Sequence, residues 1–293
     1  MPLEINRFLH NYLPGAFGLP PATELNLRPI SGGSINAAYQ LSTDHNSRWF
    51  AKFNETGPFP DLFLCEDKGL SLLRAQRILR VPETLYCLQK EGRQLLVLEW
   101  IDEGPRTTAF WRLFGEQLAA LHRQTKAGFG LSFNNYMGSL PQDNTLSTDW
   151  VDFFIHRRLE PQIRLAAGQG LLDKPAIGHF QRLYQRLPDF FPPEPPALLH
   201  GDLWAGNFLC DTQGRPVLID PAVYYGHRSI DLAMTTLFGG FEPPFYEAYH
   251  HHYPLPPDHR RQWDIANLYP LLIHLNLFGA QYMGNILTII RGF

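Results

Sequence analysis

Cysteine is scarce in this chain, and its scarcity excludes a fold built on disulfides. Cys65, Cys87 and Cys210 are the only cysteines among 293 residues, and they lack the paired spacing that binds zinc. With 44% hydrophobic residues, the chain can bury an ample core without such cross-links. Unpaired cysteines suit a reducing compartment, so we expect a cytoplasmic protein.

The chain also lacks any block of five or six like charges, and its formal net charge is −3. Nucleic-acid surfaces need clustered lysine and arginine, so we expect no nucleic-acid partner. Near the N-terminus, Glu4, Arg7 and His10 interrupt the apolar core that a secretion signal would need. The composition therefore favours a globular protein that acts on small molecules or on protein surfaces.

One stretch, residues 268–290, has no formal charge and is long enough to cross a bilayer. It nevertheless contains residues that are costly in lipid, namely Pro270, His274, Asn276, Gln281 and Asn285. Each of these needs a polar partner or a helix break within the membrane. We therefore expect a pair of buried helices here and no association with a membrane.

Chemistry-bearing residues are concentrated in LLHGDLWAGNFL, residues 198–209, and in the PVLIDPA segment that follows shortly after it. Asp202 and Asn207 lie in the first motif, and Asp220 lies in the second. Between them, two short strand-like runs, residues 208–210 and 217–219, are joined by the turn-forming sequence Asp-Thr-Gln-Gly at residues 211–214. The resulting hairpin would return Asp220 to the side of Asn207.

This spacing matches the needs of phosphoryl transfer from ATP to an alcohol. The attacking hydroxyl needs a nearby carboxylate, and Mg²⁺ prefers oxygen ligands. We therefore predict Asp202 as the base and Asn207 and Asp220 as the metal ligands. Either motif alone would also fit an ordinary turn at the end of a strand.

The first hundred residues have the pattern of a small β unit, with strand-like runs at residues 25–29, 37–41 and 48–53. Gly32, Gly33 and Ser34 lie between the first two runs. A glycine turn lets backbone N–H groups approach phosphates, so we predict that these three residues bind ATP. A plain hairpin turn is the alternative.

Lys52 stands alone in the apolar strand WFAKF, where an unpaired ammonium would be expensive to bury. Glu66 follows fourteen positions later, at the start of a segment with helical spacing that extends to Arg80. We predict that this glutamate orients Lys52 toward the ATP phosphates. The alternative is an exposed lysine on an edge strand.

The apolar strand that begins at Gln94 ends abruptly at Glu99, Trp100 and Ile101. In a two-lobed kinase, the chain crosses between lobes at this point, and its backbone meets the adenine edge. We therefore predict that these three residues bind ATP, with a simple strand-to-helix connection as the alternative.

Beyond Pro105, the pattern becomes helical, with apolar residues at helical intervals in residues 110–121, 150–167 and 177–187. Asp231 enters a further helix, where it either caps the N-terminus or braces the catalytic loop. We predict an α+β, two-lobed, protein-kinase-like fold. Its small N-terminal antiparallel β lobe spans residues 1–101, and its larger, mainly helical lobe spans residues 102–293.

The chain resembles the fructosamine kinase (ketosamine-3-kinase) family, a protein-kinase-like branch near the aminoglycoside phosphotransferases. The resemblance extends over almost the full length, through FAKFNE, LVLEWID, LLHGDLWAGN, IDPAVYYG, DLAM and LYPLLIHLNLFGAQY. Trp204 within HGDLW is its sharpest marker, because aminoglycoside and choline kinases usually carry another residue there.

The resemblance implies ATP- and Mg²⁺-dependent phosphorylation of the 3-hydroxyl of a ketoamine, either small or protein-bound. It implies the roles already predicted for Asp202, Asn207, Asp220, Lys52, Glu66 and residues 99–101. It also places Trp204 against the sugar, or as a brace of the loop, and gives His200 and Asp231 supporting roles. His227 and Ser229 stand where relatives usually carry acids, which leaves the acceptor contacts of that loop open.

Two alternatives remain at this level. The first is an aminoglycoside- or choline-type phosphotransferase. A polycationic aminoglycoside would call for several carboxylates in the substrate lobe, yet no Asp or Glu follows Asp264. A nucleotide-binding pseudokinase usually lacks one or more of the five residues Lys52, Glu66, Asp202, Asn207 and Asp220. All five are present here.

Overall fold

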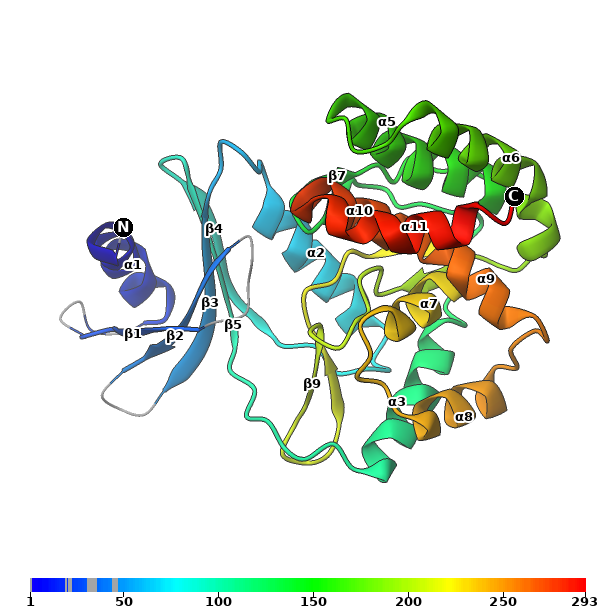
Figure 1. Ribbon diagram of the computed structural model, residues 1–293. Coiled ribbons are helices and arrows are strands. Elements are labelled where there is room, and N and C mark those ends of the chain that lie inside the picture. The colour runs from blue at the N-terminus through cyan, green and yellow to red at the C-terminus, as the bar shows by residue number, and fades with distance from the viewer. Residues whose placement is uncertain (1, 19, 21–22, 31–35, 44–46) are drawn as a thin grey trace. The chain divides into compact units, whose positions relative to one another are not determined.

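The structure is a computed structural model, and it describes residues 2–18, 20, 23–30, 36–43 and 47–293 (Figure 1). It divides into two compact units: residues 1–71 with 82–102, and residues 72–81 with 103–293. The predicted α+β fold, a small antiparallel β part followed by a mostly helical part, is confirmed. Residues 72–81, which we had placed in the N-terminal lobe, group with the second unit.

The first unit is built on a five-stranded antiparallel sheet in the order β1-β2-β3-β5-β4. Its strands are β1 (Asn26–Pro29), β2 (Ala37–Ser42), β3 (Arg48–Glu55), β4 (Thr84–Lys90) and β5 (Arg93–Glu99). The register pairs Lys52 with Ala38 on one neighbouring strand and with Leu96 on the other. Lys52 therefore lies in the interior of the sheet, and the edge-strand alternative is wrong.

Helix α1 (Pro2–Ala16) covers one face of this sheet. Its buried side chains pack against alternate residues of β3 and β5, among them Ala51, Phe53, Leu95 and Val97. Side chains alternate between the two faces of a strand. Lys52 therefore points to the opposite face from α1, the face from which α2 (Leu62–Ala75) supplies Glu66.

Three elements of this unit differ from the sequence-based expectation. Neither α1 nor β4 was predicted, and α2 begins at Leu62 and ends at Ala75, whereas a segment from Glu66 to Arg80 was expected. The helix stops because Arg77 adopts a left-handed backbone with φ of 55°, after which Arg80 bridges to Val217. Apolar spacing alone did not reveal this end.

The second unit contains most of the helices. They are α3 (Thr108–Leu121), α4 (Trp150–Phe153), the π-helical segment η1 (Phe154–Leu159), α5 (Glu160–Gly168), α6 (Lys174–Phe190), α7 (Ser229–Leu237), α8 (Pro243–His252), α9 (His259–Ala266), α10 (Leu268–Phe278), the 3₁₀ turn η2 (Ala280–Tyr282) and α11 (Met283–Ile290). Short strands form three two-stranded ladders: β6 (Asn135–Met137) with β7 (Leu140–Gln142), β8 (Ala197–Leu199) with β11 (Tyr224–Gly226), and β9 (Phe208–Cys210) with β10 (Pro216–Leu218).

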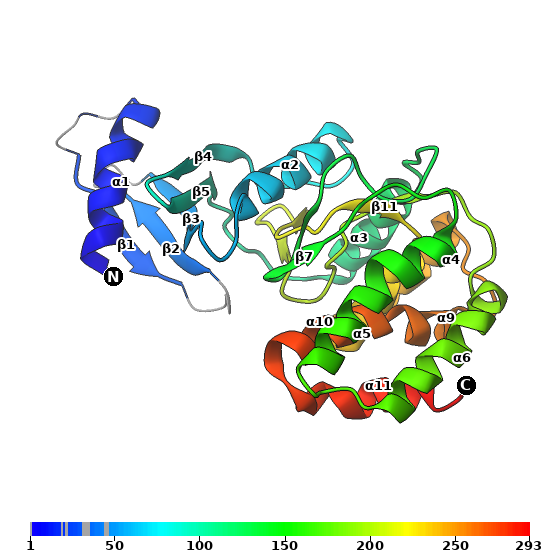
Figure 2. The same ribbon diagram turned by 90° about the horizontal axis from the view of Figure 1, so that it is seen from above.

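The uncharged stretch near the C-terminus forms two helices, α10 and α11, as predicted. The chain breaks between them at Gly279, whose φ of 93° favours glycine. Figure 2 shows α5 beside α10 and α6 beside α11. Burial is extensive in α10 but limited to Ile286 and Ile290 in α11. Across the described residues, no helix combines the length and the apolar character needed to cross a membrane.

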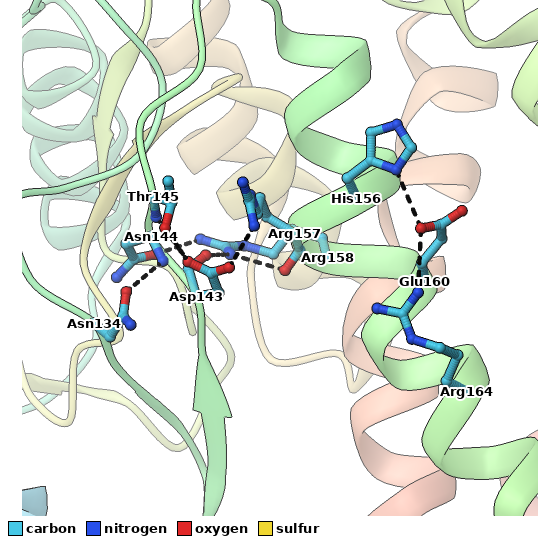
Figure 3. A network of polar contacts seen from close by, with 9 residues as sticks. All are labelled: Asn134, Asp143, Asn144, Thr145, His156, Arg157, Arg158, Glu160 and Arg164. Carbon is cyan, nitrogen blue, oxygen red and sulfur yellow. Dashed lines mark hydrogen bonds and ion pairs between the residues drawn. The ribbon is translucent and has the colours of Figure 1, made fainter.

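A fully buried arginine, Arg158, lies at the junction of η1 and the β6–β7 region (Figure 3). Its guanidinium donates to the carbonyl of Asp143 and to Oδ1 of Asn144, each over 2.6 Å. It also lies 4.0 Å from the ring centroid of Tyr224 and 4.6 Å from that of Phe153. Hydrogen bonds and aromatic faces thus replace the water that this cation has lost.

We expect Arg158→Ala to lower the free energy of unfolding by about 3 kcal/mol, because it leaves buried acceptors unpaired and opens a cavity. Arg164, on the same helical run, is a matched control: its side chain is 69% exposed and pairs with Glu160 over 3.4 Å. Arg164→Ala should change that free energy by about 0.5 kcal/mol or less. Urea unfolding of both variants measures the difference, and equal effects would contradict the structural role of Arg158.

Candidate active site

The β9–β10 hairpin carries the chain from Asn207 to Asp220, as the sequence predicted. Phe208 pairs with Leu218, and Cys210 pairs with Pro216, across an antiparallel ladder. Just outside the ladder, the N–H of Ile219 donates to the carbonyl of Asn207 over 3.1 Å. The backbone thus holds the segment before Asp220 against Asn207.

Asp211 fixes the turn of this hairpin. Its Oδ1 accepts hydrogen bonds from the N–H groups of Gln213 and Arg215, both over 2.9 Å. Its Oδ2 accepts from Arg80 over 2.6 Å and from Arg215 over 2.8 Å. Burial alone would raise the pKa of Asp211, but these hydrogen bonds outweigh it and lower the pKa to about 2. The turn is therefore held by a permanent negative charge.

The backbone before Asp202 is held by Asp231 of α7. Oδ2 of Asp231 accepts from the N–H of His200 over 2.7 Å, and Oδ1 accepts from the N–H of Gly201 over 2.8 Å. Gly201 has a φ of 84°, and a Cβ there would overlap the carbonyl of Ala222. Only glycine fits this turn without displacing the chain that follows Asp220.

Asp231 is fully buried, and it is contacted by His122, the residue that directly follows α3. Nε2 of His122 lies 3.2 Å from Oδ2 of Asp231, and its Nδ1 lies 2.8 Å from the hydroxyl of Tyr249. Because a carboxylate can only accept, the Nε2 nitrogen carries the proton, and Nδ1 accepts from the tyrosine. Sequence reasoning did not identify His122 or Tyr249. His122 lies 109 positions from Asp231 and 127 positions from Tyr249.

His200 ties the Asp202 loop to the chain that leads into Asp220. Its Nε2 donates to the carbonyl of Ile219 over 2.9 Å, and its Nδ1 accepts from the N–H of Asp202 over 3.3 Å. Burial lowers the pKa of His200, so the imidazole is neutral and keeps this single tautomer.

Asn207 and Asp202 are in direct contact. Nδ2 of Asn207 donates to the backbone carbonyl of Asp202 over 2.8 Å and to its Oδ2 over 2.9 Å. The amide nitrogen is thereby committed, so Oδ1 is the atom that Asn207 offers to a cation. The donor set of one amide oxygen and one nearby carboxylate, Asp220, fits magnesium.

The carboxyl of Asp202 has an unusually high pKa of about 7. Burial is the main cause, and the negative charges of Asp220 and Asp231 raise the pKa further, against the hydrogen bond from Asn207. A carboxyl poised near neutrality is suited to accepting a proton during a reaction.

Asp220 itself has a left-handed backbone, with a φ of 55°. Such a conformation costs about 1 kcal/mol in a residue other than glycine, and at functional sites it is retained when the surroundings impose it. The residues that follow are fixed by the β6–β7 hairpin, since Gln142 donates to the carbonyl of Ala222 and Asn135 donates to that of Val223. The hydroxyl of Tyr269 in turn holds Gln142 over 2.9 Å.

In the first unit, Lys52 and Glu66 form a buried ion pair. Nζ of Lys52 lies 2.8 Å from Oε1 of Glu66, and the two side chains are 5% and 11% exposed. Moving two charges out of water costs free energy that offsets much of their mutual attraction. The burial of this pair is therefore weak evidence that its role is to stabilise the fold alone. The arrangement fixes the ammonium at the face of the sheet opposite α1.

The predicted adenine-binding segment follows β5. The N–H of Glu99 already donates to the carbonyl of Glu83 over 2.9 Å, so a base contact by Glu99 would use its carbonyl. The indole of Trp100 donates to Asp102 over 3.1 Å, and Arg48 also binds Asp102 over 2.8 Å. The predicted glycine-loop residues Gly32, Gly33 and Ser34 lie outside the described residues.

Trp204 lies over the catalytic loop, where a Cβ on Gly206 would overlap its indole ring. The ring is partly exposed and meets Phe238 edge-on, with 5.8 Å between centroids. Trp204 therefore braces the loop through Gly206 and still presents surface to solvent.

His227 and Ser229, the two departures from the resembled family, are buried side by side. Nδ1 of His227 lies 2.8 Å from the hydroxyl of Ser229, and the two residues are each 1% exposed. Burial lowers the pKa of His227 to about 4, so the imidazole is neutral. Both residues thus belong to the core beneath the loop and do not line its surface.

Comparisons with known proteins agree over nearly the whole chain. The family model for fructosamine kinases matches residues 19–293. A probable ketoamine kinase of Synechocystis sp. is 40% identical over 257 residues, which are 87% of this chain and 85% of that protein. A chloroplastic protein-ribulosamine 3-kinase of Arabidopsis thaliana is 36% identical over 266 residues, covering 89% of this chain and 80% of that protein.

Among solved structures, a Thermobifida fusca protein provisionally assigned as a fructosamine-3-kinase matches with a TM-score of 0.84 and 31% identity. The match covers 96% of this chain and 98% of that one. The protein-kinase-like fold expected from the sequence is thereby confirmed. Since the family model, the relatives and the solved structure agree, the chain belongs to the fructosamine kinase family.

Proposed function

We propose that this protein transfers the terminal phosphoryl group of ATP to the 3-hydroxyl of a ketoamine, the sugar adduct of a glycated amine. Family membership supports the reaction class. The observation that carries the proposal is the contact of Asp202 with Asn207, whose amide donates to the carbonyl of Asp202 over 2.8 Å and to its Oδ2 over 2.9 Å. The acceptor is either a small adduct or one carried on a protein.

Asp202 is the proposed base. Because Asn207 occupies Oδ2, the other oxygen, Oδ1, would accept the proton of the attacking hydroxyl. The new bond joins the sugar oxygen to phosphorus, the bond from phosphorus to the β-phosphate oxygen breaks, and the proton passes to Asp202. Asp231 and His200 keep the loop in place during this transfer through their backbone contacts.

Asn207 and Asp220 are the proposed magnesium ligands, through an amide oxygen and a carboxylate. When bound, Mg²⁺ supplies neutralisation of the charge on the phosphate oxygens. The hydrogen bonds from Nδ2 of Asn207 to Asp202 support this assignment, because they leave Oδ1 of Asn207 as the atom available to a cation. For Asp220, the support is the backbone bond from Ile219 to Asn207, which holds the preceding residue against the other proposed ligand.

Lys52, oriented by Glu66, is the proposed cation for the ATP phosphates. Residues 99–101 are the proposed adenine contact through backbone groups, and Gly32, Gly33 and Ser34 are the proposed phosphate loop. We propose that Trp204 packs against the sugar with the exposed part of its ring, while its covered part rests on Gly206.

We further place the protein in a reducing compartment, the cytoplasm. The described cysteines Cys65, Cys87 and Cys210 are all free thiols, and burial raises the pKa of each. Protonated, partly buried thiols react slowly and suit a compartment without disulfide chemistry.

The pH dependence of the reaction tests the role of Asp202. Only the ionised carboxyl accepts a proton, so kcat/KM should rise with pH through about 7 and level off above it. The negative charge of Asp220 raises the pKa of Asp202, and bound magnesium would offset that charge. The midpoint of the kcat profile should therefore lie at a lower pH than the midpoint of the kcat/KM profile. Steady-state profiles from pH 5 to 9 measure both, and a rate that falls as pH rises through 7 would contradict the assignment.

The acceptor is tested by ATP consumption with four compounds. We expect turnover of fructosyl-lysine and ribulosyl-lysine, and little or none of kanamycin and choline. Turnover of kanamycin alone would replace the ketoamine assignment with an aminoglycoside phosphotransferase. Binding of ATP without turnover of any hydroxyl compound would favour a nucleotide-binding pseudokinase.

A further inference from the structure

A row of aromatic rings leads away from the catalytic loop of the second unit. Trp204 meets Phe238 edge-on, and Phe238 lies 4.8 Å from the ring of His274 in α10. The ring of His274 lies 5.4 Å from Phe278 and 5.0 Å from Tyr282. We call Phe238, His274, Phe278 and Tyr282 the aromatic shelf. It is joined to Trp204 through the ring of Phe238.

The shelf is fixed to the loop that carries Asp202. Phe238 follows α7 directly, and the next two residues, Gly239 and Gly240, have φ values of 71° and 88°. A Cβ on Gly240 would lie 2.6 Å from the Cβ of Ala205, so the chain after Phe238 touches the catalytic loop. The two glycines thus allow a turn that brings the ring beside Trp204.

The shelf is open to solvent. Phe238 is 40% exposed and Phe278 is 42% exposed. They are two of the four large hydrophobic residues that are exposed in the described part of the chain. Exposed apolar side chains that adjoin one another, unlike scattered ones, are a feature of binding surfaces. An open surface accommodates a group that continues outward, whereas a closed pocket would admit only a small one.

The chemistry of the shelf suits an alkylammonium group. The nitrogen of a ketoamine carries a positive charge, and aromatic faces attract cations as well as alkyl chains. Residues 268–290 carry no formal charge, so α10 and α11 offer this surface apolar and aromatic groups that suit the alkyl part of the substituent. His274 donates from Nδ1 to the carbonyl of Pro270 over 2.7 Å, and burial lowers the pKa of its imidazole, which keeps that ring uncharged.

We propose that the aromatic shelf binds the substituent on the ketoamine nitrogen, namely the four-carbon stem of a glycated lysine side chain. This inference rests on the proposed function, since it assigns the part of the acceptor that does not react. The sugar lies at Trp204, the stem lies along Phe238 and Phe278, and the peptide that carries the lysine continues into solvent. The enzyme therefore prefers lysine adducts to adducts of amines without a stem.

The experiment compares two acceptors, a peptide that contains fructosyl-lysine and fructosyl-methylamine, which lacks the stem. The wild-type kcat/KM should be about tenfold higher for the peptide, since part of the stem leaves water. Phe238→Ala and Phe278→Ala should each raise KM for the peptide by about threefold to tenfold, with kcat little changed. The kinetics of Phe278→Ala with fructosyl-methylamine should stay within about twofold, because Phe278 is separated from Trp204 by Phe238 and His274.

Leu146→Ala is the matched control, because Leu146 is 66% exposed and stands outside the shelf. It should leave both acceptors unaffected. Phe238→Leu and Phe278→Leu keep an apolar side chain of similar size, so they replace the alanine variants if either of those is unstable. Their kcat/KM for the peptide should fall less than that of the alanine variants. If the alanine variants lost kcat/KM equally with both acceptors, or if the wild type did not prefer the peptide, the proposed role of the shelf would be wrong. The ketoamine kinase assignment would remain in place. Failure of the wild type to phosphorylate either acceptor would instead overturn the proposed function.

Discussion

Asp202→Asn should lower kcat by about a hundredfold to ten-thousandfold, the range expected for loss of a general base. Asparagine has the same size, and its side-chain oxygen can still accept the hydrogen bond from Asn207. What it loses is the ability to take the proton of the attacking hydroxyl. The affinity for ATP should stay within about twofold. Single-turnover kinetics and a nucleotide-binding titration separate the two effects.

The stability of this variant supplies an internal control. The pKa of Asp202 is about 7 in the folded protein, whereas an unfolded aspartate titrates near 4. The folded state therefore binds the proton more tightly, and the wild-type protein loses stability as pH rises from about 4 to about 7. Asparagine has no such titration, so at pH 8 the variant should be at least as stable as the wild type. An inactive variant that is also unfolded would not support the base assignment.

Asp211→Asn is the matched comparison, since Asp211 is a nearby carboxylate whose pKa is lowered, whereas the pKa of Asp202 is raised. Its pKa of about 2 lies below the unfolded value, so its charge contributes stability that is present above about pH 4 and lost as pH falls toward 2. The asparagine variant should melt at a lower temperature near neutral pH than the wild type. Its kcat, measured well below that temperature, should fall by about tenfold or less. A kcat loss as large as that of Asp202→Asn would show that hairpin geometry, and not proton transfer, limits the reaction.

Much of the second-unit site follows from local sequence. Asp202, Asn207 and Asp220 are joined by a short hairpin, and its strands and turn lie within one residue of their predicted positions. Such a hairpin is specified by residues that are near one another in the chain, namely apolar runs and a turn with Asp and Gly. The spacing of the polar residues then determines which side chains converge.

The supports of that site were less accessible to sequence reasoning. Asn135 and Gln142 hold the carbonyls of Val223 and Ala222 from residues 80 or more positions away, and His122 holds Asp231 across 109 positions. An isolated Asn, Gln or His carries no local signal for its distant partner. These contacts follow from the packing of α3, β6 and β7 around the loop, which only the folded chain defines.

Helix α2 shows why an element boundary was missed. Leu70, Leu73, Arg74 and Arg77 continue the helical spacing, yet the helix ends at Ala75 because Arg77 adopts a positive φ. Glycine usually marks such an end, and arginine in its place leaves no sign in the pattern. Strand β4 was missed for a different reason: most of its residues are half-buried or exposed, so no clear alternation appears.

Lys52→Met should lower kcat/KM for ATP by about a hundredfold to a thousandfold, the loss expected when one positioned donor to a charged transition state is removed. Methionine keeps the apolar stem but cannot hold phosphate. Glu66→Gln should cost about tenfold, because the amide oxygen still accepts from Lys52 while the ion pair is lost. Lys90→Met is the control on the same sheet, since Lys90 is exposed on β4, and it should leave the kinetics unchanged.

The buried pair requires one further variant, because Lys52→Met leaves Glu66 in a site where it is only 11% exposed and lacks its cation. The loss of this buried ion pair should lower the melting temperature, and a stability effect could then be mistaken for a catalytic one. The double variant Lys52→Met with Glu66→Leu removes both charges and should recover most of the lost stability, since an apolar pair of similar volume needs no desolvation. Its kcat/KM should remain as low as that of Lys52→Met. Recovery of activity together with stability would mean that the pair only supports the sheet, and that the ATP phosphates are held by other groups.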